Sequence, residues 1–358
     1  MDMTPAAGHV LSVDPPILYS RPRPAPFGLA GMMAPRATDR AMTAIIQTMW
    51  TLEREQPLSE IVILARAFRR RYPLLTVIIA ANTAKELELL HLNGVSAVLA
   101  NHNIFVDETM FRPLPAVQPR YDAIYNAKFS AFKRRELCAE LPNCAHIGYL
   151  SSNPAKADPL TRFRAAAAGL PQHDFLNPVS GTTVKWLEPA QVNRALAQAH
   201  VGLCLSAEEG AMIASMEYLL AGVPVVTTPS LGGRDRYFTP ETSITAEDNP
   251  RAIREAVEAL KARNIPRNVV RRKTLHLLNR DRAQFNAFVD GLRGGKVPVS
   301  NDPRWSFDYT ANLFGWRTAG DFAALLGLPS GPLAQSIGSQ ELMDGALLDE
   351  DLAPVRMG

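Results

Sequence analysis

Glu209 and Glu217 stand eight residues apart in a segment whose pattern suits the binding of a phosphorylated, hydroxyl-rich ligand. The segment VGLCLSAEEGAMIASMEYLLAGVPVVTT predicts a strand that ends at Ser206, a short acidic loop, and a helix that begins at Gly210 or Ala211. Backbone amides at such a helix N-terminus favour phosphate. Carboxylates suit hydroxyl donors such as sugar and ribose groups. A sugar linked through a pyrophosphate presents both kinds of group.

The elements around this segment alternate between strands and helices. LLTVIIAAN, TAKELELLHLNG and VSAVLA predict strand, helix and strand, and the alternation starts again at residue 121. Between the two blocks, residues 112–120 hold three prolines and form the best linker candidate. With 358 residues the chain is long enough for two domains. The sequence therefore predicts an α/β protein with two doubly wound domains.

Four regions follow from this organisation. We expect an N-terminal domain at residues 1–115, a second domain at 116–298, a helical segment at 299–330 that packs back on the first domain, and a disordered tail at 331–358. Within the first region, the proline-rich opening of residues 1–38 leaves room for only a short strand at His9–Val13. Three further helices are predicted: 39–53 with Thr38 or Asp39 as cap, 58–72 with Ser59 as cap, and 132–141.

Composition excludes several classes of protein. Lys and Arg number 38 against 35 acidic residues, for a net charge of +3, and no basic-aromatic repeat occurs, which disfavours a nucleic-acid binder. The excess of positive charge falls in residues 119–300, where an anionic ligand would be best accommodated. The three cysteines form no C-x-x-C pair, which indicates a reducing, cytoplasmic setting. Neither a Walker loop nor a dinucleotide fingerprint occurs.

The two glutamates, the glycine after the first, and the AGVPVV strand together resemble the donor-site motif (E-x7-E) of retaining GT-B glycosyltransferases, the group 1 or family 4 enzymes. The resemblance implies two Rossmann-type domains facing a cleft. The first of these is expected to be reduced, because its opening lacks the family's Gly-Gly loop. By the same resemblance, Glu217 would bind the nucleotide ribose and Glu209 would contact the transferred sugar, with Gly210 and Ala211 contributing to the donor site.

Other residues match the family's pattern in turn. Lys128 stands where the family has Arg, and Lys133 where it has Lys; the resemblance implies that both contact the donor diphosphate. Gly232 and Gly233 resemble the glycine-bearing loop beside the ligand, and His102 follows a strand toward the expected cleft. The resemblance thus assigns catalysis to Glu209 and Lys133. His102 does not align with the family's catalytic histidine and is predicted to be catalytic from its place at the end of a strand. It implies no metal and no cofactor apart from the donor substrate.

The predicted function is transfer of a sugar from a nucleoside diphosphate sugar to an unknown acceptor, whether a glycan, a lipid-linked molecule or a small molecule, with retention of configuration. A non-catalytic nucleotide-sugar-binding relative and a nucleotide-sugar epimerase stay open as alternatives. Arg66 and Arg69 to Arg71 crowd one end of an amphipathic helix. These arginines either compensate the helix dipole or contact a membrane surface. The predicted location is therefore the cytoplasm, and contact with the inner face of the membrane stays open as an alternative.

Overall fold

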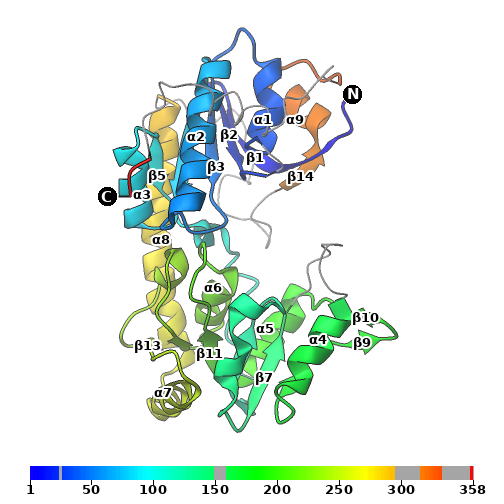
Figure 1. The fold of residues 1–358 in the computed structure, drawn as a ribbon, viewed down its shortest axis with the longest axis vertical. Helices are drawn as coiled ribbons and strands as arrows, with labels where there is room; N and C mark the ends of the chain where they lie inside the picture. The colour runs from blue at the N-terminus through cyan, green and yellow to red at the C-terminus, as the bar shows by residue number, and fades with distance from the viewer. Residues whose placement is uncertain (24–25, 149–158, 295–314, 333–354, 358) are drawn as a thin grey trace. The chain divides into compact units, whose positions relative to one another are not determined.

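The chain divides into two compact α/β units (Figure 1). The first unit comprises Met1–Phe105 together with Arg280–Gly358, and the second comprises Val106–Asn279. Within its described residues, each unit contains a six-stranded sheet. The computed structural model describes residues 1–23, 26–148, 159–294, 315–332 and 355–357.

The sheet of the first unit has the strand order β14-β1-β2-β3-β4-β5. Strands β2 to β5 run parallel to one another, whereas β1 is antiparallel to both of its neighbours. Central strands such as β4 are continuous apolar runs, as expected for strands covered on both faces. The strands are β1 (Pro5–Val13), β2 (Pro16–Ser20), β3 (Met42–Gln47), β4 (Leu75–Ala81), β5 (Ala97–Leu99) and β14 (Gly315–Thr318).

Helices cover both faces of this sheet. Leu18 of β2 belongs to an apolar core that includes residues of α1, α2, α3 and α9. The next residue, Tyr19, points to the other face, where its ring lies 4.7 Å from Phe105 and 6.4 Å from Phe285 of α8. The elements are α1 (Leu29–Met33), η1 (Ala34–Arg36), α2 (Glu55–Arg71), α3 (Ala84–Leu92), η2 (His102–Phe105), α8 (Arg267–Leu292) and α9 (Ala319–Leu325).

The sheet of the second unit is entirely parallel, in the order β13-β12-β11-β6-β7-β8. Numbered along the unit, this is the 3-2-1-4-5-6 order of a doubly wound dinucleotide-type fold. The direction in which the sheet is wound reverses between β6 and β11, which are neighbouring parallel strands. The strands are β6 (Tyr121–Asn126), β7 (Cys144–Ile147), β8 (Asp174–Phe175), β11 (Ala199–Cys204), β12 (Val225–Thr227) and β13 (Ser243–Thr245).

Local capping defines the helix starts of the second unit. At the start of α5, Glu188 and Gln191 form a capping box, and Pro189 occupies the first helical position. At the start of α7, the Asn249 side chain accepts a hydrogen bond of 2.8 Å from Ala252 N. The remaining elements are η3 (Ala131–Lys133), η4 (Arg135–Cys138), α4 (Pro159–Ala168), the hairpin β9 (Val179–Ser180) and β10 (Thr183–Val184), α5 (Pro189–Ala197), α6 (Ile213–Leu220), η5 (Gly233–Asp235) and α7 (Pro250–Ala262).

The predicted fold class, two doubly wound α/β domains of parallel-rich sheets, is confirmed. The prediction that the first domain is reduced finds no support in its sheet, since this has as many described strands as the other. Among the described residues, no helix is long and apolar enough to cross a membrane.

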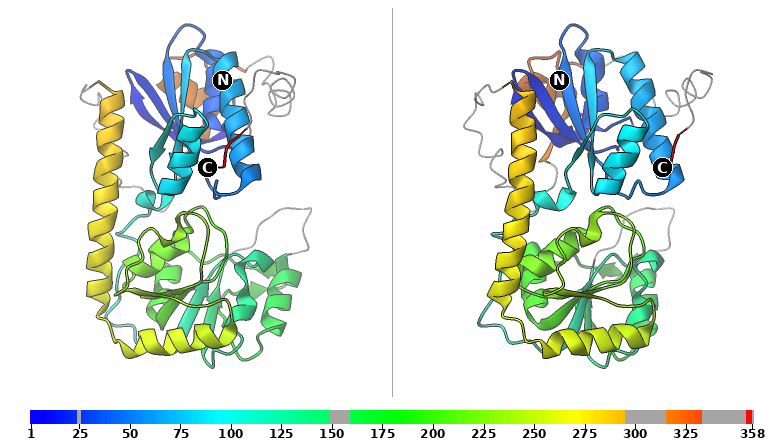
Figure 2. Two further views of the ribbon diagram at one scale, coloured as in Figure 1. Left: turned by 60° about the vertical axis from the view of Figure 1, so that its left-hand side comes forward. Right: turned by 90° about the vertical axis from the view of Figure 1, so that its left-hand side faces the viewer.

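The division between the units differs from the predicted one. Residues 106–115 belong to the second unit, where the backbone of Arg112 exchanges hydrogen bonds of 3.0 and 3.2 Å with the side chain of Asn193. The last turns of α8, the long yellow helix in Figure 2, belong to the first unit. There Arg282 Nε donates to Ile104 O at 2.8 Å.

The predicted helix at 39–53, with its cap at Thr38 or Asp39, is wrong. Its first half is strand β3, which lies between β2 and β4 in the sheet. Ile45 and Ile46 are fully buried there, so pairing and packing outweigh the helical spacing of the apolar residues. The helix predicted at 58–72 is α2, which begins earlier at Glu55 with Arg54 rather than Ser59 as its N-cap.

The proline-rich opening contains more structure than predicted. Strands β1 and β2 form an antiparallel pair, and each begins with a proline, a position where a strand tolerates the missing donor. The helix predicted at 132–141 is also wrong: two short 3-10 turns, η3 and η4, occupy the segment. Arg134 between them has a left-handed φ of 50°, which interrupts helical continuity.

The C-terminal predictions fall partly outside the described residues. Of the segment 299–330, the described residues 315–330 form β14, which pairs with β1, and helix α9. Of the predicted disordered tail, the described residues 355–357 contact the first unit. The backbone N and O of Arg356 each bond to the Asn93 side chain at 2.8 Å.

Candidate functional site

The candidate site of the second unit lies at the ends of β6 and β11. In a doubly wound sheet, ligands bind beyond the carboxyl ends of the strands at the point where the winding reverses. Here β6 ends at Asn126 and β11 ends at Cys204, and the two strands are neighbours. The segments that follow these strands carry Lys133 and Glu209, so the fold brings the predicted residues to one place.

Lys133 and Glu209 form a buried ion pair. The Lys133 ammonium donates to Glu209 Oε1, and each side chain is only 8% exposed. Ser206 Oγ donates to the same oxygen at 2.5 Å. The ammonium and hydroxyl donors replace the hydrogen bonds to water that the carboxylate loses on burial. The pair also places a cation and a carboxylate together at the strand ends, as binding of a charged, hydroxyl-bearing ligand requires.

The backbone around Lys133 is fixed from two sides. Tyr125 Oη of β6 donates to Lys133 O at 2.5 Å. Arg134, in its left-handed conformation, reaches Leu205 O at 2.5 Å and Asp248 at 2.8 and 3.1 Å. Arg134 thereby ties the turn that carries Lys133 to the end of β11. Sequence reasoning missed this residue because its partners are distant along the chain.

Glu217 of helix α6 is half-buried, and its carboxyl group contacts Asn126 at the end of β6. Asn126 Nδ2 donates to Glu217 Oε2 at 2.6 Å, and Asn126 N donates to the Tyr218 hydroxyl at 2.5 Å. Burial raises the pKa of Glu217 to about 7, while the Asn126 hydrogen bond acts in the opposite direction. The carboxyl is therefore close to half-ionised at neutral pH, and a hydroxyl donor would favour its charged form.

The predicted start of the following helix is corrected by the structure. Helix α6 begins at Ile213, not at Gly210 or Ala211. Met212 precedes it with a left-handed φ of 47°, a conformation that a non-glycine residue seldom adopts and that interrupts the helix. Gly210 and Ala211 are buried in the loop, and Gly210 O accepts from Gly233 N at 2.5 Å.

The Gly232-Gly233 loop lies against that segment. Gly232 has a φ of 90°, which only glycine adopts readily, and Gly233 begins the turn η5. The bond from Gly233 N to Gly210 O joins the two predicted glycine positions. Lys128, the other predicted cation, is half-buried after β6, and its carbonyl accepts from Arg135 Nη1 at 2.8 Å.

Arg234 is the largest buried polar side chain of this region and was not among the predicted site residues. It is fully buried, pairs with Asp235 at 2.6 Å, and donates to Ser206 O at 2.5 Å and to Thr228 O. Because the Ser206 hydroxyl donates to Glu209, Arg234 supports the buried ion pair by holding the backbone of Ser206. A lone RD dipeptide after two glycines is the only sequence signal that could have pointed to it.

His102 belongs to the first unit and is not part of the cluster just described. It is 3% exposed in the turn η2 after β5, and its backbone N donates to Asn82 Oδ1 with a separation of 3.0 Å. Burial lowers the pKa of His102 to about 4, so the imidazole is neutral at physiological pH. A neutral, buried imidazole can accept or donate one hydrogen bond to an uncharged group.

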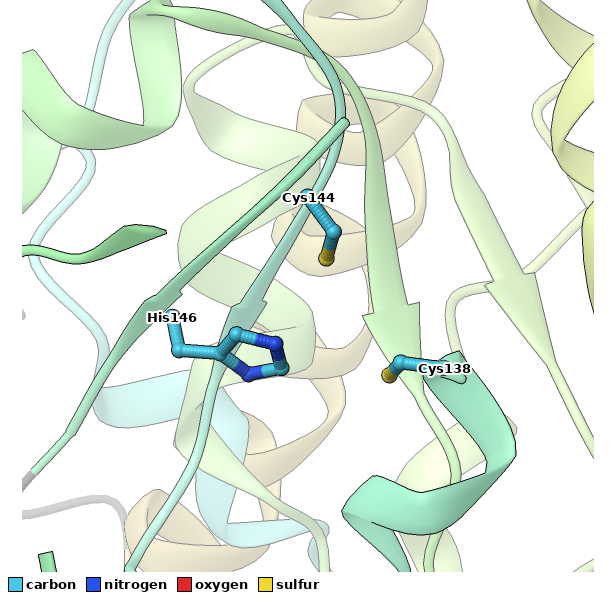
Figure 3. A group of neighbouring side chains, drawn as sticks. All are labelled: Cys138, Cys144 and His146. Atoms are coloured by element: carbon cyan, nitrogen blue, oxygen red, sulfur yellow. The ribbon is translucent and has the colours of Figure 1, made fainter. Parts of the chain in front are cut away.

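One group of described residues has the composition of a metal site. Cys138, Cys144 and His146 are all buried, and their ligand atoms lie within 4.8 Å of one another (Figure 3). Cys138 ends the turn η4, while Cys144 and His146 belong to β7. None of the three is among the residues that the resemblance assigns to the donor site.

Comparison with solved structures agrees with the fold. Anabaena HepE in complex with UDP matches with a TM-score of 0.52 at 12% identity, over 74% of this chain and 76% of that one. A glycosyltransferase from Rickettsia africae gives 0.51 at 14% identity, over 78% and 77%. A trehalose-6-phosphate synthase gives 0.50 at 10% identity, over 73% and 70%. None of the curated proteins matches the chain.

Two parallel-rich sheets and these structural matches define a protein of the GT-B glycosyltransferase fold. Residues 154–263 match the family model described as glycosyl transferases group 1, a span that contains both glutamates and the Gly232-Gly233 loop. Over this span the chain is similar to group 1 glycosyltransferases.

Proposed function

We propose that the protein is a glycosyltransferase that takes its sugar from a nucleoside diphosphate sugar and transfers it with retention of configuration. The buried Lys133–Glu209 pair at the winding reversal carries the proposal, since it supplies a cation for the diphosphate and a carboxylate for the sugar hydroxyls. That Anabaena HepE was solved in complex with UDP supports a nucleotide ligand.

Each site residue has a role in this proposal. Lys133 and Lys128 neutralise the charge that develops on the leaving diphosphate, so the leaving group is stabilised electrostatically. Glu217 accepts hydrogen bonds from the ribose hydroxyls, and Glu209 orients the transferred sugar. The Gly210-Ala211 and Gly232-Gly233 segments bring backbone close to the donor.

His102 is proposed as the residue of the first unit that contacts the donor sugar. Its neutral, buried imidazole suits a hydroxyl better than a phosphate, because it brings no charge. His102→Phe keeps an aromatic ring of similar buried size and removes both nitrogens. We expect it to lower kcat while UDP affinity, measured by calorimetry, stays within about twofold, as for an interaction made only in the transition state.

The decisive experiment is a donor screen with UDP-, GDP-, ADP- and dTDP-sugars, read by mass spectrometry for transfer or donor hydrolysis. The anomeric configuration of the product, read by NMR, tests retention. Lys133→Ala is expected to lower turnover by about 100-fold or more. Lys85→Ala removes an exposed lysine of α3 and serves as the matched control.

Nucleotide binding without turnover on any donor would favour a non-catalytic relative instead. Unchanged turnover in Lys133→Ala would contradict the assigned role of the ion pair. Because removal of one partner of a buried pair also destabilises the protein, each variant is first checked for an unchanged circular dichroism spectrum at the assay temperature.

Peripheral contact with an anionic membrane surface is proposed as a way to reach a lipid-linked acceptor. Arg69, Arg70 and Arg71 end helix α2 and are all exposed. Co-sedimentation with vesicles of anionic lipid, compared with neutral vesicles, tests it. A triple Arg→Gln variant that sediments as well as the wild type would contradict the contact.

A further inference from the structure

Cys138, Cys144 and His146 converge on one space beside strand β7 (Figure 3). Two thiol sulfurs and a ring nitrogen lie within 4.8 Å of one another, and none of the three residues is more than 1% exposed. Cys144 and His146 are two residues apart in a strand, so their side chains share a face of the sheet. Cys138 joins them from the turn η4.

Hydrogen bonds around His146 define which of its nitrogens carries a proton. His173 Nε2 lies 2.8 Å from Leu141 O, which can only accept, so the proton is on His173 Nε2. His173 Nδ1 then accepts from His146 Nε2 at 3.0 Å. In the neutral ring this leaves the lone pair on His146 Nδ1, which is buried and has no hydrogen-bond partner among the described residues.

This arrangement is that of a histidine prepared for metal. A metal-binding imidazole typically donates its second N–H to a partner that fixes its orientation, as His146 does to His173. A proton on the remaining nitrogen of His146 would be an uncompensated charge in the interior. A ring nitrogen of His146 and the two thiols form a soft ligand set, which selects thiophilic ions such as Zn²⁺.

Burial raises the pKa of the Cys144 thiol, and the charge of the nearby Arg135 acts in the opposite direction. Arg135 belongs to the same turn as Cys138, is 7% exposed, and donates to the carbonyls of Ala127 and Lys128. Its guanidinium interacts favourably with negative charge on both Cys138 and Cys144. A thiolate is the form of cysteine that binds metal.

We propose that Cys138, Cys144 and His146 bind one thiophilic metal ion of the Zn²⁺ class, with a water completing the coordination. The ion links the turn η4 to strand β7. Since η4 follows η3 directly along the chain, the ion also holds the segment that carries Lys133. The site stands apart from the proposed donor chemistry and its test needs no transferase activity.

The test is a metal titration of the full-length, reduced chain after removal of metal by dialysis. Equilibrium dialysis with Zn²⁺ is expected to give one ion per chain, with release of protons from the thiols. Cd²⁺ is expected to produce the ultraviolet absorption of cadmium–thiolate bonds. Cys138→Ser, Cys144→Ser and His146→Phe are expected to abolish this binding, and His173→Phe to weaken it by about 10-fold to 100-fold.

Cys204→Ser is the matched control, because Cys204 is the third buried cysteine and lies outside the cluster. It is expected to bind both ions as the wild type does. The Cd²⁺ titration of the wild type needs no variant, so the proposal stays testable if a substitution prevents folding. Absence of a thiolate band in a chain whose thiols are shown to be reduced would overturn it. So would loss of the band in Cys204→Ser with retention in Cys138→Ser.

Discussion

Replacing Glu217 by Gln tests the electrostatics of the candidate site without reference to substrate. Burial raises the pKa of Glu217 from 4.5 to about 7 in the folded protein. Between these two values the unfolded chain loses its proton while the folded chain keeps it, so stability falls as pH rises from about 4.5 to about 7. Above that range the destabilisation is complete and constant.

The magnitude follows from the two pKa values. One pKa unit corresponds to about 1.4 kcal/mol, so the rise from 4.5 to about 7 corresponds to about 3 kcal/mol of lost stability at pH 8. A glutamine carries no charge and can still accept the bond from Asn126 Nδ2. Glu217→Gln is therefore expected to be more stable than the wild type at pH 8, by up to about 3 kcal/mol, and nearly equal to it at pH 4.5.

Urea unfolding of the wild type and the variant at a series of pH values measures this difference. Subtracting one protein from the other removes the contributions of all other titrating groups. Glu258→Gln, at an exposed position of α7, controls for the loss of one carboxylate. If the advantage of Glu217→Gln is absent at pH 8, or does not shrink toward pH 5, the carboxyl is not held in its neutral form by burial and the reasoning is refuted.

Four further substitutions test the site's construction. Lys133→Met and Glu209→Gln should each lower the free energy of unfolding in urea by about 3 to 5 kcal/mol, because each leaves the other member of the buried pair without its partner. Additive losses in the double variant would contradict direct pairing. Met212→Gly should lower the free energy of unfolding by about 2 to 4 kcal/mol, because the loss of a buried methionine side chain outweighs about 1 kcal/mol of relieved left-handed strain; an unchanged or raised value would contradict this packing. Gly202→Ala puts a Cβ 2.5 Å from the Tyr218 ring, so a loss of about 1 to 3 kcal/mol in unfolding free energy is expected, and an unchanged value would contradict this close packing.

The second unit was largely predictable from sequence because its signals are local. Apolar runs of strand length, such as VGLCLS for β11, alternate with capped helices, such as α5 with Pro189 at its first position. A parallel sheet buries its strands on both faces, so each strand is a continuous apolar run that stands out against an amphipathic helix. The same periodicity located the glutamates relative to β11 and α6.

The first unit was less predictable because tertiary pairing decides its early elements. MTAIIQ has apolar residues at a spacing that suits a helix as well as a strand, and only its place between β2 and β4 settles the choice. The prolines at the first positions of β1 and β2 were read as obstacles to a sheet, although a strand tolerates them there. The pairing of β1 with β14 joins segments about 300 residues apart, which no local pattern encodes.

At the candidate site, spacing predicted the two glutamates but not the residues that hold them. Glu209 and Glu217 follow from one stretch of sequence, whereas Asn126 at the end of β6 donates to Glu217, and Arg234 in the turn η5 donates to the backbone of Ser206. Arg134 occupies a left-handed position where glycine would be expected, so its sequence identity gave no hint of its backbone conformation. Residues of this kind become visible only when the strand ends are brought together.

The pairing of Lys133 with Glu209 imposes a condition on the proposed reaction. The Lys133 ammonium already donates to a buried carboxylate, so a distant phosphate would add little stabilisation. A bound diphosphate must therefore replace Glu209 as the ion-pair partner of Lys133. That exchange leaves Glu209 without its ion pair but still within reach of Ser206. The hydroxyl groups of the donor sugar can then replace the lost ammonium. Diphosphate and sugar would thus stabilise each other's binding through one ion pair, which predicts that the intact donor binds more tightly than the sum of its separate parts implies.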